Sequence, residues 1–359
     1  MIRYIIRKLL YSLLVVWGVV TVVFLIFNIL PGDPARMMVG QRADEETIEA
    51  IRDELGLNEP VMKQYLGYLN NLSPVSYHTY NVEHRLFFMD PAKYGSSRIL
   101  FGREGKWAVL LKAPYLGTSF QSRKSVTATI LGALPNSLIL AFVSILLGSV
   151  MGIMTGIFAA IWKDSLFDRL GLFFSALGMS LPSFFAAIII GWIFAYLLSD
   201  ITGLNLTGNL YEVDDLGGGI HLVLKNLILP AVTLAIRPLS VIMQLTRNSL
   251  LDVLSQDYIR TAWAKGLSYT RIIYRHALRN AMNPVITAVS GWFASLMAGV
   301  IFVEYIYGWQ GLGFVIVNAL NNYDFPLVLG SVVFISVIFV IINILVDITY
   351  AFIDPRVRN

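Results

Sequence analysis

The chain has 359 residues, of which 56% are hydrophobic, 14% are charged and none is cysteine. An ordinary soluble domain carries about 25% charged residues, so this composition excludes a typical water-soluble enzyme. The lack of cysteine also excludes disulfides and thiolate metal sites. The excess of 27 basic over 23 acidic residues is small, and its meaning depends on where the charges lie.

Five stretches without a charged residue are long enough to cross a lipid bilayer, which takes about 20 mostly apolar residues. They are residues 9–30, 125–162, 170–199, 280–303 and 325–346. Leu, Ile, Val and Phe fill most of the last stretch, and at roughly −0.4 kcal/mol each they favour its insertion by about 7 kcal/mol. Buried core helices of a large soluble protein are the alternative, and runs of this length disfavour it.

A sixth stretch, residues 226–246, is apolar except for Arg237 and also contains Pro230 and Pro238. Its Leu, Ile and Val residues favour insertion by roughly 4 kcal/mol, and one central arginine removes about 3 kcal/mol of this. Because the remainder is marginal, we expect this segment inside a helical bundle, with Arg237 turned away from lipid. The sequence therefore predicts an integral membrane protein with six transmembrane helices.

The positions of the basic residues orient these six spans. An even number of spans places both termini on one side of the membrane, and the short loops on the opposite side contain only Lys225. The basic residues on the side of the termini are Arg3, Arg7, Lys8, Lys163, Arg169, Arg247, Arg260, Lys265, Arg271, Arg275, Arg279, Arg356 and Arg358. By the positive-inside rule both termini are predicted to be cytoplasmic, and the basic excess does not indicate nucleic-acid binding. The first span is too long for a signal peptide and lacks a cleavage site, so an uncleaved anchor is expected.

Residues 31–124 form the large polar segment that this topology places outside the cytoplasm. A first helix is predicted to begin at residues 44–46, which are acidic, and to end at Gly56. Pro60 suits the start of a second helix over residues 61–72.

Residues 73 to about 114 differ from the rest of this segment. Eight aromatic residues from Tyr77 to Tyr115 alternate with glycine, proline and charged residues. This pattern predicts a small folded lobe with β-structure. The aromatic residues either form its own core or contact a partner protein.

Residues 247–283 form the other distinctive segment, which is too charged to span the membrane and compatible with helix throughout. Two short helices are predicted, broken at residues 266–268, with Ser268 as the N-cap of the second. Exposed short helices between two spans are suited to docking in the groove of a partner. The alternative is a basic loop that only sets the topology.

Part of this segment resembles the EAA loop of binding-protein-dependent ABC importer permeases. The loop pattern is Glu-Ala-Ala, three residues, Gly, nine residues, Ile, one residue and Leu-Pro. Gly266 matches it, whereas residues 260–262 are Arg-Thr-Ala, His276 stands at the Ile position and residues 278–279 are Leu-Arg. These departures resemble the form seen in the dipeptide, oligopeptide and nickel permease subfamily.

Both ends of the chain resemble the same subfamily. The first span is followed by Leu-Pro-Gly-Asp-Pro at residues 30–34, and the last third contains Glu304 and then Gly-Trp-Gln-Gly-Leu-Gly at residues 308–313. Residues 354–356 are Asp-Pro-Arg. The resemblance implies an all-α type I ABC importer permease fold with an extracytoplasmic insertion between helices 1 and 2.

The domain organisation expected from this resemblance has three parts. Residues 1–30 form the cytoplasmic N-terminus and the first helix. Residues 31–124 form the extracytoplasmic segment, with short helices and the inserted lobe at about 73–114. Residues 125–359 form the permease core with helices 2–6, including the EAA-like loop at about 247–283.

The resemblance also implies an ATP-driven transporter, yet the chain has no Gly-x-x-x-x-Gly-Lys-Ser/Thr motif for ATP. Gly105-Lys106 lacks both the first glycine and the hydroxyl residue. ATP and Mg are therefore expected on partner ATPase subunits, and no cofactor is expected on this chain. The further expected partners are a second homologous permease subunit, an extracytoplasmic solute-binding protein and membrane lipid.

Candidate site residues follow from the same comparison. The candidates for coupling to the ATPase are Asp257, Arg260, Thr261, Ala262, Lys265, Gly266, Arg271, His276 and Asn280. The candidates for an outer loop or gate are Glu304, Gly308, Gly311 and Gly313. The four histidines are scattered without metal-ligand spacing, so no metal site is predicted.

Arg237 is the candidate pore-lining residue, because intramembrane charges usually face a cavity or a partner. It either attracts the carboxylate of a peptide or forms a structural pair with Asp347, Glu304 or a backbone carbonyl. The sequence leaves both alternatives open.

The function predicted from the sequence is the permease subunit of an ABC importer in the bacterial cytoplasmic membrane, with a peptide-like solute. Nickel or another small solute is the alternative, since these substrates share the scaffold. A secondary transporter would more often show two matching halves with broken helices, and no such repeat is visible. An intramembrane enzyme would need a nucleophile and base or a metal set within the spans, and none is evident.

Overall fold

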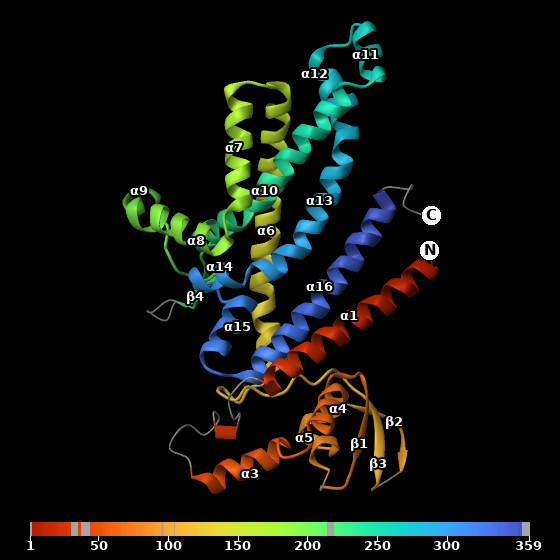
Figure 1. Cartoon of the computed structure of the whole chain (residues 1–359). Coiled ribbons are helices and arrows are strands. Elements are labelled where there is room, and N and C mark those ends of the chain that lie inside the picture. Colours follow the sequence, from red (N-terminus) through yellow and green to blue (C-terminus); the bar gives the residue numbers. More distant parts are fainter. Residues whose placement is uncertain are drawn as a thin grey trace. The chain divides into compact units, whose positions relative to one another are not determined.

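The computed structural model describes residues 2–29, 35–36, 44–82, 84–94, 97–103, 105–213 and 219–353 (Figure 1). The motifs at residues 30–34 and 354–356 lie outside the described residues. The chain forms two compact units, one comprising residues 133–317 and 338–359 and the other residues 2–132 and 318–337.

The first unit is a bundle of helices. Its elements are α6 (Val126–Ile161), α7 (Leu166–Ser180), α8 (Ser183–Gly191), the π-helix η2 (Trp192–Leu197), α9 (Ser199–Thr202), β4 (Tyr211–Val213), β5 (Ile220–Leu222), α10 (Lys225–Leu254), α11 (Asp257–Ala264), α12 (Tyr269–Arg271), the π-helix η3 (Ile272–Ala277), α13 (Leu278–Gly299), α14 (Ile301–Ile306), α15 (Leu312–Asn321) and α16 (Phe325–Ile353). The first turns of α6 and α16 and the end of α15 belong to the second unit.

Among the described residues, three helices are long and apolar enough to cross a membrane: α6, α10 and the segment Phe325–Val346 of α16. The pair formed by α7 and Ser183–Leu197 makes a fourth if the bent pair is one span. Helices α1 and α13 lie on the predicted stretches 9–30 and 280–303. The count of six spans remains a prediction.

The stretch 170–199 is not the continuous helix that its lack of charge suggested. The chain bends by 111° between α7 and α8. The break falls at Leu181 and Pro182, where the proline has no N–H for the helical ladder and disfavours helical backbone at the residue before it. The apolar pattern alone does not reveal the change of direction.

Helix α10 lies close to α6 because α6 presents a row of glycines to it. A Cβ atom at Gly148, Gly152 or Gly156 would lie 3.0, 2.8 or 2.6 Å from backbone oxygens of α10. Small residues at this spacing let two membrane helices approach backbone to backbone. Because α10 also packs against α7, α8 and α13, it forms the centre of this unit.

The second unit contains α1 (Ile2–Ile29) and an α/β lobe. The elements of the lobe are α3 (Glu45–Leu55), α4 (Val61–Leu72), β1 (Val75–Thr79), the 3-10 helix η1 (Arg85–Phe87), α5 (Pro91–Tyr94), β2 (Arg98–Arg103) and β3 (Trp107–Leu111). The strands form an antiparallel sheet in the order β1-β3-β2. Helix α3 ends at Gly56, whose φ is +68°, as the sequence predicts.

Contacts of α4 join the lobe to the first helix and hold the lobe together. The hydroxyls of Thr21 on α1 and Tyr65 on α4 are 2.6 Å apart, and the ring of Phe24 stacks on Tyr68 at 5.8 Å. Within the lobe, the Lys112 Nζ donates to the carbonyl of Asn71 in the last turn of α4, at 2.5 Å. The lobe is therefore packed against α1 through α4.

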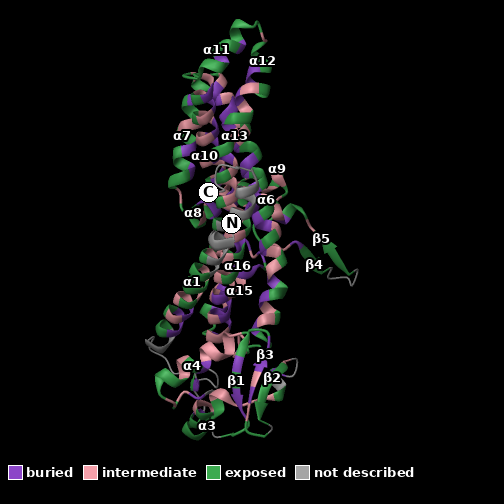
Figure 2. Ribbon diagram, turned by 90° about the vertical axis from the view of Figure 1, so that its right-hand side faces the viewer, coloured by how far each residue is buried: buried purple, intermediate pink, exposed green. Residues whose placement is uncertain are grey.

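The predominantly helical fold confirms the predicted fold class. The described residues also contain the three-stranded sheet of the lobe, where the sequence predicts β-structure, and a two-stranded sheet of β4 and β5. Figure 2 shows β2, β4 and β5 as exposed strands. These strands lie in the polar connections, where alternating aromatic and β-branched residues favour pairing over helix.

Candidate functional site

The helix pair at residues 257–277 forms as predicted. Figure 1 shows α11 and α12 beyond the ends of α10 and α13. Gly266 lies between α11 and α12 with φ of +72°, and no atom lies within 4 Å of the place where its Cβ would be. The glycine is thus required by backbone conformation and not by crowding. Ser268 occupies the N-cap position, but its side chain makes no capping hydrogen bond.

One face of this helix pair packs against its own chain. Ile259 and Ala262 of α11 and Ile272 of η3 are buried in a cluster with Ile157 of α6 and Leu250 of α10. Ala262, one of the predicted coupling residues, therefore anchors the helix and does not face outward. The helix pair is a rigid extension of α6 and α10 because this apolar face is fully covered.

The opposite face of the helix pair is open. The predicted coupling residues that are exposed are Asp257, Arg260, Thr261, Lys265, Gly266, Arg271 and Asn280. His276 is half-buried. Asn280 donates to the hydroxyl of Tyr258 at 2.8 Å, and that hydroxyl donates to the carbonyl of His276 at 3.4 Å. Tyr258 joins the two helices, a role that the sequence did not indicate.

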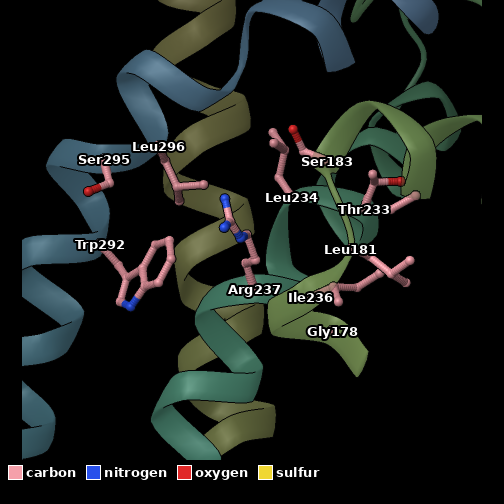
Figure 3. Close-up of a pocket in the computed structure, with 11 residues that line it drawn as sticks. Gly178, Leu181, Ser183, Thr233, Leu234, Ile236, Arg237, Trp292, Ser295 and Leu296 are labelled. Atoms are coloured by element: carbon pink, nitrogen blue, oxygen red, sulfur yellow. The ribbon is translucent and has the colours of Figure 1, made fainter. Parts of the chain in front are cut away.

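Arg237 lies at a cavity of about 260 Å³ in the first unit. The cavity is bounded by the break between α7 and α8 and by α10 and α13, and its lining residues are Gly178, Leu181, Ser183, Ala186, Thr233, Leu234, Ile236, Arg237, Trp292, Ser295 and Leu296. Figure 3 shows the guanidinium of Arg237 between Trp292 and Leu296 on one side and Leu234 on the other. A cation, an indole ring and apolar walls thus converge on one space.

Within the described part of the chain, no side chain or carbonyl forms a hydrogen bond or ion pair with Arg237. Glu304, one of the structural partners considered for it, bonds elsewhere. The side chain of Asp347, the other acidic candidate, lies outside the described residues. An arginine in lipid is strongly disfavoured unless water, a polar solute or an acidic partner compensates its charge.

Glu304 belongs to a buried network under the turn of residues 307–313, the predicted outer loop, which is called the outer turn below. Its side chain is fully buried, Ser137 Oγ donates to its Oε1 at 2.6 Å, and the N–H of Gly313 donates to its Oε2 at 2.6 Å. The N–H of Leu312 donates to Ser137 Oγ at 2.8 Å. A carboxylate at this place stabilises the N-terminus of α15, because it accepts from N–H groups that have no partner within the helix and because its charge complements the helix dipole.

The glycines of the outer turn each have a geometric reason. Gly308 has a φ of +64°. A Cβ on Gly311 would overlap the carboxylate of Glu304, and a Cβ on Gly313 would overlap the backbone of Ile301. These residues therefore hold a close-packed turn around Glu304.

Comparison with known proteins identifies the chain. Residues 152–359 match the family described as the binding-protein-dependent transport system inner membrane component, and residues 1–84 match the N-terminal part of such membrane components. The chain belongs to this family. It is a permease subunit of an ABC importer, and members of the family are membrane components of transport systems and not enzymes.

Curated relatives align with this permease over its whole length. The dipeptide transport system permease protein DppB of Alkalihalophilus pseudofirmus is 32% identical, with 100% of both chains covered. The glutathione transport system permease protein GsiC of Salmonella typhimurium is 32% identical over 100% of this chain and 99% of its own. The di/tripeptide transport system permease protein DppB of Pseudomonas aeruginosa is 31% identical with the same coverage.

The permease contains an ion pair that the sequence did not indicate. The Nε and Nη2 of Arg247 on α10 donate to Oδ1 and Oδ2 of Asp168 on α7, at 2.5 and 2.6 Å. Asp168 has a side chain only 2% exposed, and its N–H donates to Ser165 Oγ at 3.3 Å. The sequence suggested only a topological role for Arg247. The sequence pattern that could have revealed the ion pair is the Ser-x-x-Asp spacing of Ser165 and Asp168, which marks a helix N-terminus with an acidic side chain in its first turn.

Proposed function

We propose that this permease forms the translocation path for a peptide-like solute delivered by an extracytoplasmic solute-binding protein. The observation that carries the proposal is Arg237, whose guanidinium lies at a cavity between α7, α8, α10 and α13 and has no partner among the described residues. A cation in the membrane interior is compatible with stable folding where a water-filled path or an anionic solute compensates it.

The solute class is supported by chemistry as well as by relatives. Dipeptides, tripeptides and glutathione, the solutes in the relatives' names, all carry free carboxylates. Arginine binds a carboxylate through two parallel N–H donors, and Trp292 offers an apolar wall beside it. An amidated or uncharged end of a solute lacks the matching acceptor.

The proposed assembly contains a second, related permease and two ATPase subunits. The exposed face of α11 and η3 docks on an ATPase, because its own buried face holds it rigidly to α6 and α10. ATP and Mg are bound by the ATPases, and this chain binds no cofactor. Both termini and the helix pair lie in the cytoplasm, six helices span the inner membrane, and residues 31–124 lie outside.

The test is the variant Arg237→Gln in the assembled transporter, with peptides that differ only at the C-terminus. A charge-assisted hydrogen bond contributes about 1.5–3 kcal/mol, so uptake of free-carboxylate peptides should fall at least about tenfold. Uptake of C-terminally amidated peptides should change much less. The matched control is Arg103→Gln, which removes an exposed arginine of β2 in the lobe.

Equal losses for both kinds of peptide would contradict carboxylate recognition by Arg237. Unchanged uptake of both kinds, with the complex assembled, would contradict its place in the path.

A further inference from the structure

Two buried hydroxyls connect the outer turn with the wall of the Arg237 cavity. The hydroxyl of Tyr307 lies 2.9 Å from Thr233 Oγ1 on α10 and donates to the carbonyl of Ala187 on α8 at 3.0 Å. Thr233 Oγ1 also lies 2.8 Å from the carbonyl of Leu229. Tyr307 is 2% exposed and Thr233 is 3% exposed, so neither hydroxyl depends on bulk water.

These contacts cannot all be hydrogen bonds at the same time. Each hydroxyl has one proton to donate, whereas three oxygen–oxygen contacts need three donors. In one arrangement Tyr307 donates to Ala187 and Thr233 donates to Tyr307. In a second arrangement Tyr307 donates to Thr233, and Thr233 donates to Leu229. In a third, Tyr307 donates to Ala187 and Thr233 donates to Leu229, which leaves no proton between the two hydroxyls. Of the three arrangements, only the second leaves α8 without its bond to Tyr307.

The position of α8 matters because this helix forms a wall of the cavity. It begins after the break at Leu181 and Pro182, and Ser183 and Ala186 of α8 line the cavity. Ala187, which accepts the hydrogen bond, is the residue after Ala186 and has no exposed surface. Release of this one bond therefore acts directly beside the cavity.

The other end of Tyr307 belongs to the outer turn. Its carbonyl accepts from the N–H of Gly208 at 3.0 Å, and the next residue, Gly308, has a left-handed backbone. Trp309 follows, with its indole N–H donating to the carbonyl of Asn136 at 3.0 Å. A displacement of the outer turn thus moves the Tyr307 ring and its hydroxyl together.

We propose that the hydroxyl pair of Tyr307 and Thr233 is a latch through which the outer turn controls the position of α8. The latched state has Tyr307 bonded to Ala187, and the released state has Tyr307 bonded to Thr233. Tyr307 is a positioning residue, since it acts on the cavity through α8. The inference rests on the proposed function, because it assigns the Arg237 cavity to the translocation path.

The test uses the absence of cysteine from the native chain. Ser183→Cys places a single thiol on α8 at the cavity, and its rate of reaction with a water-soluble thiol reagent reports the state of α8 in the assembled transporter. Tyr307→Phe removes the hydroxyl and keeps the ring. Loss of a hydrogen bond of about 1 kcal/mol changes a two-state equilibrium about fivefold, so the reaction should become about five times faster.

Four further variants separate a latch from general damage. Thr233→Val removes the acceptor of the released state, so Tyr307 stays bonded to Ala187 and the reaction should become slower, whereas Thr233→Ser keeps the hydroxyl and should preserve the rate. The double variant of Tyr307→Phe and Thr233→Val should react like Tyr307→Phe alone, because without the Tyr307 hydroxyl no bond to Ala187 remains for Thr233 to influence. Tyr211→Phe, at an exposed tyrosine of β4, should behave as the parent.

A reaction rate within twofold of the parent in Tyr307→Phe would overturn the latch. If that variant does not assemble, equal rates in Thr233→Val and Thr233→Ser would overturn it instead. Protection of Ser183→Cys by a free-carboxylate peptide tests the proposed function separately. If the peptide protects the thiol and Tyr307→Phe does not change the reaction rate, the translocation path stands and the latch is contradicted. If the peptide does not protect the thiol, the proposed path is contradicted.

Discussion

Gly266 shows how one residue decides the geometry of the predicted coupling segment. Its φ of +72° belongs to the left-handed region, which glycine adopts without strain and β-branched residues strongly disfavour. Open space surrounds the position, so a side chain is excluded by the backbone alone. The turn between α11 and α12 is therefore sensitive to side-chain shape in a predictable way.

We expect Gly266→Val to reduce solute-stimulated ATP hydrolysis of the assembled transporter while the protein still inserts in the membrane. The backbone strain amounts to about 1–3 kcal/mol, and the turn can relieve it by moving α11 relative to α12. Gly266→Asn should retain most activity, because asparagine tolerates this backbone conformation.

Gly105→Val is the matched control, since Gly105 has a φ of +68° with open space around it in the lobe. ATP hydrolysis at the parent level in Gly266→Val would show that the turn is not part of the coupling surface.

At the scale of elements, the contact between α6 and α10 positions the cavity. The row of glycines on α6 lets the two backbones approach, and α10 carries both Arg237 and Thr233. The ion pair of Asp168 and Arg247 ties the same helix to α7. The cavity wall thus depends on contacts that lie away from it.

We expect Gly152→Leu to destabilise the permease, because a Cβ there would lie 2.8 Å from the Leu239 carbonyl and 3.0 Å from side-chain atoms of Ile242. Overpacking of this kind costs about 1–3 kcal/mol. The measurement is the temperature at which half of the purified protein aggregates.

Gly132→Leu serves as the control, since Gly132 lies on the same helix with nothing within 4 Å of a Cβ. An equal aggregation temperature for Gly152→Leu and the parent protein would mean that α6 and α10 do not pack this closely.

At the scale of the whole molecule, the described surface is too apolar for a chain that works alone in water. On the arm formed by α8, η2 and α9, Trp192 is 54% exposed, Tyr196 is 70% exposed and Ile201 is 83% exposed. Large exposed apolar patches indicate contact with lipid or with another subunit. The sequence also contains no ATP-binding motif of its own, while the family works in ATP-driven importers.

We therefore expect isolation from native membranes to yield a complex with a second, related permease and ATPase subunits. The measurement is the subunit composition of the purified complex together with its ATP-dependent uptake. A stable homomeric preparation that transports solute without ATP would contradict this assembly. A complex of this permease with ATPase subunits that transports solute without a second permease would contradict only the prediction of a second permease.

Features that depend on neighbouring residues can be predicted from the sequence alone. The apolar runs located the long helices, Gly56 marked the end of α3, and Gly266 marked the break in the helix pair. Each of these follows from local backbone preference or from the period of apolar residues. The family resemblance was also carried by short motifs, which sequence comparison confirmed.

The tertiary structure decided what distant residues do to one another. Ser137 and Glu304 are 167 positions apart, Asp168 and Arg247 are 79 apart, and Thr233 and Tyr307 are 74 apart. No periodicity encodes such pairs, because they form only where packed helices bring side chains together. The same packing engages Glu304 in hydrogen bonds and leaves Arg237 without a partner among the described residues. The chemistry of the cavity is thus a property of the fold.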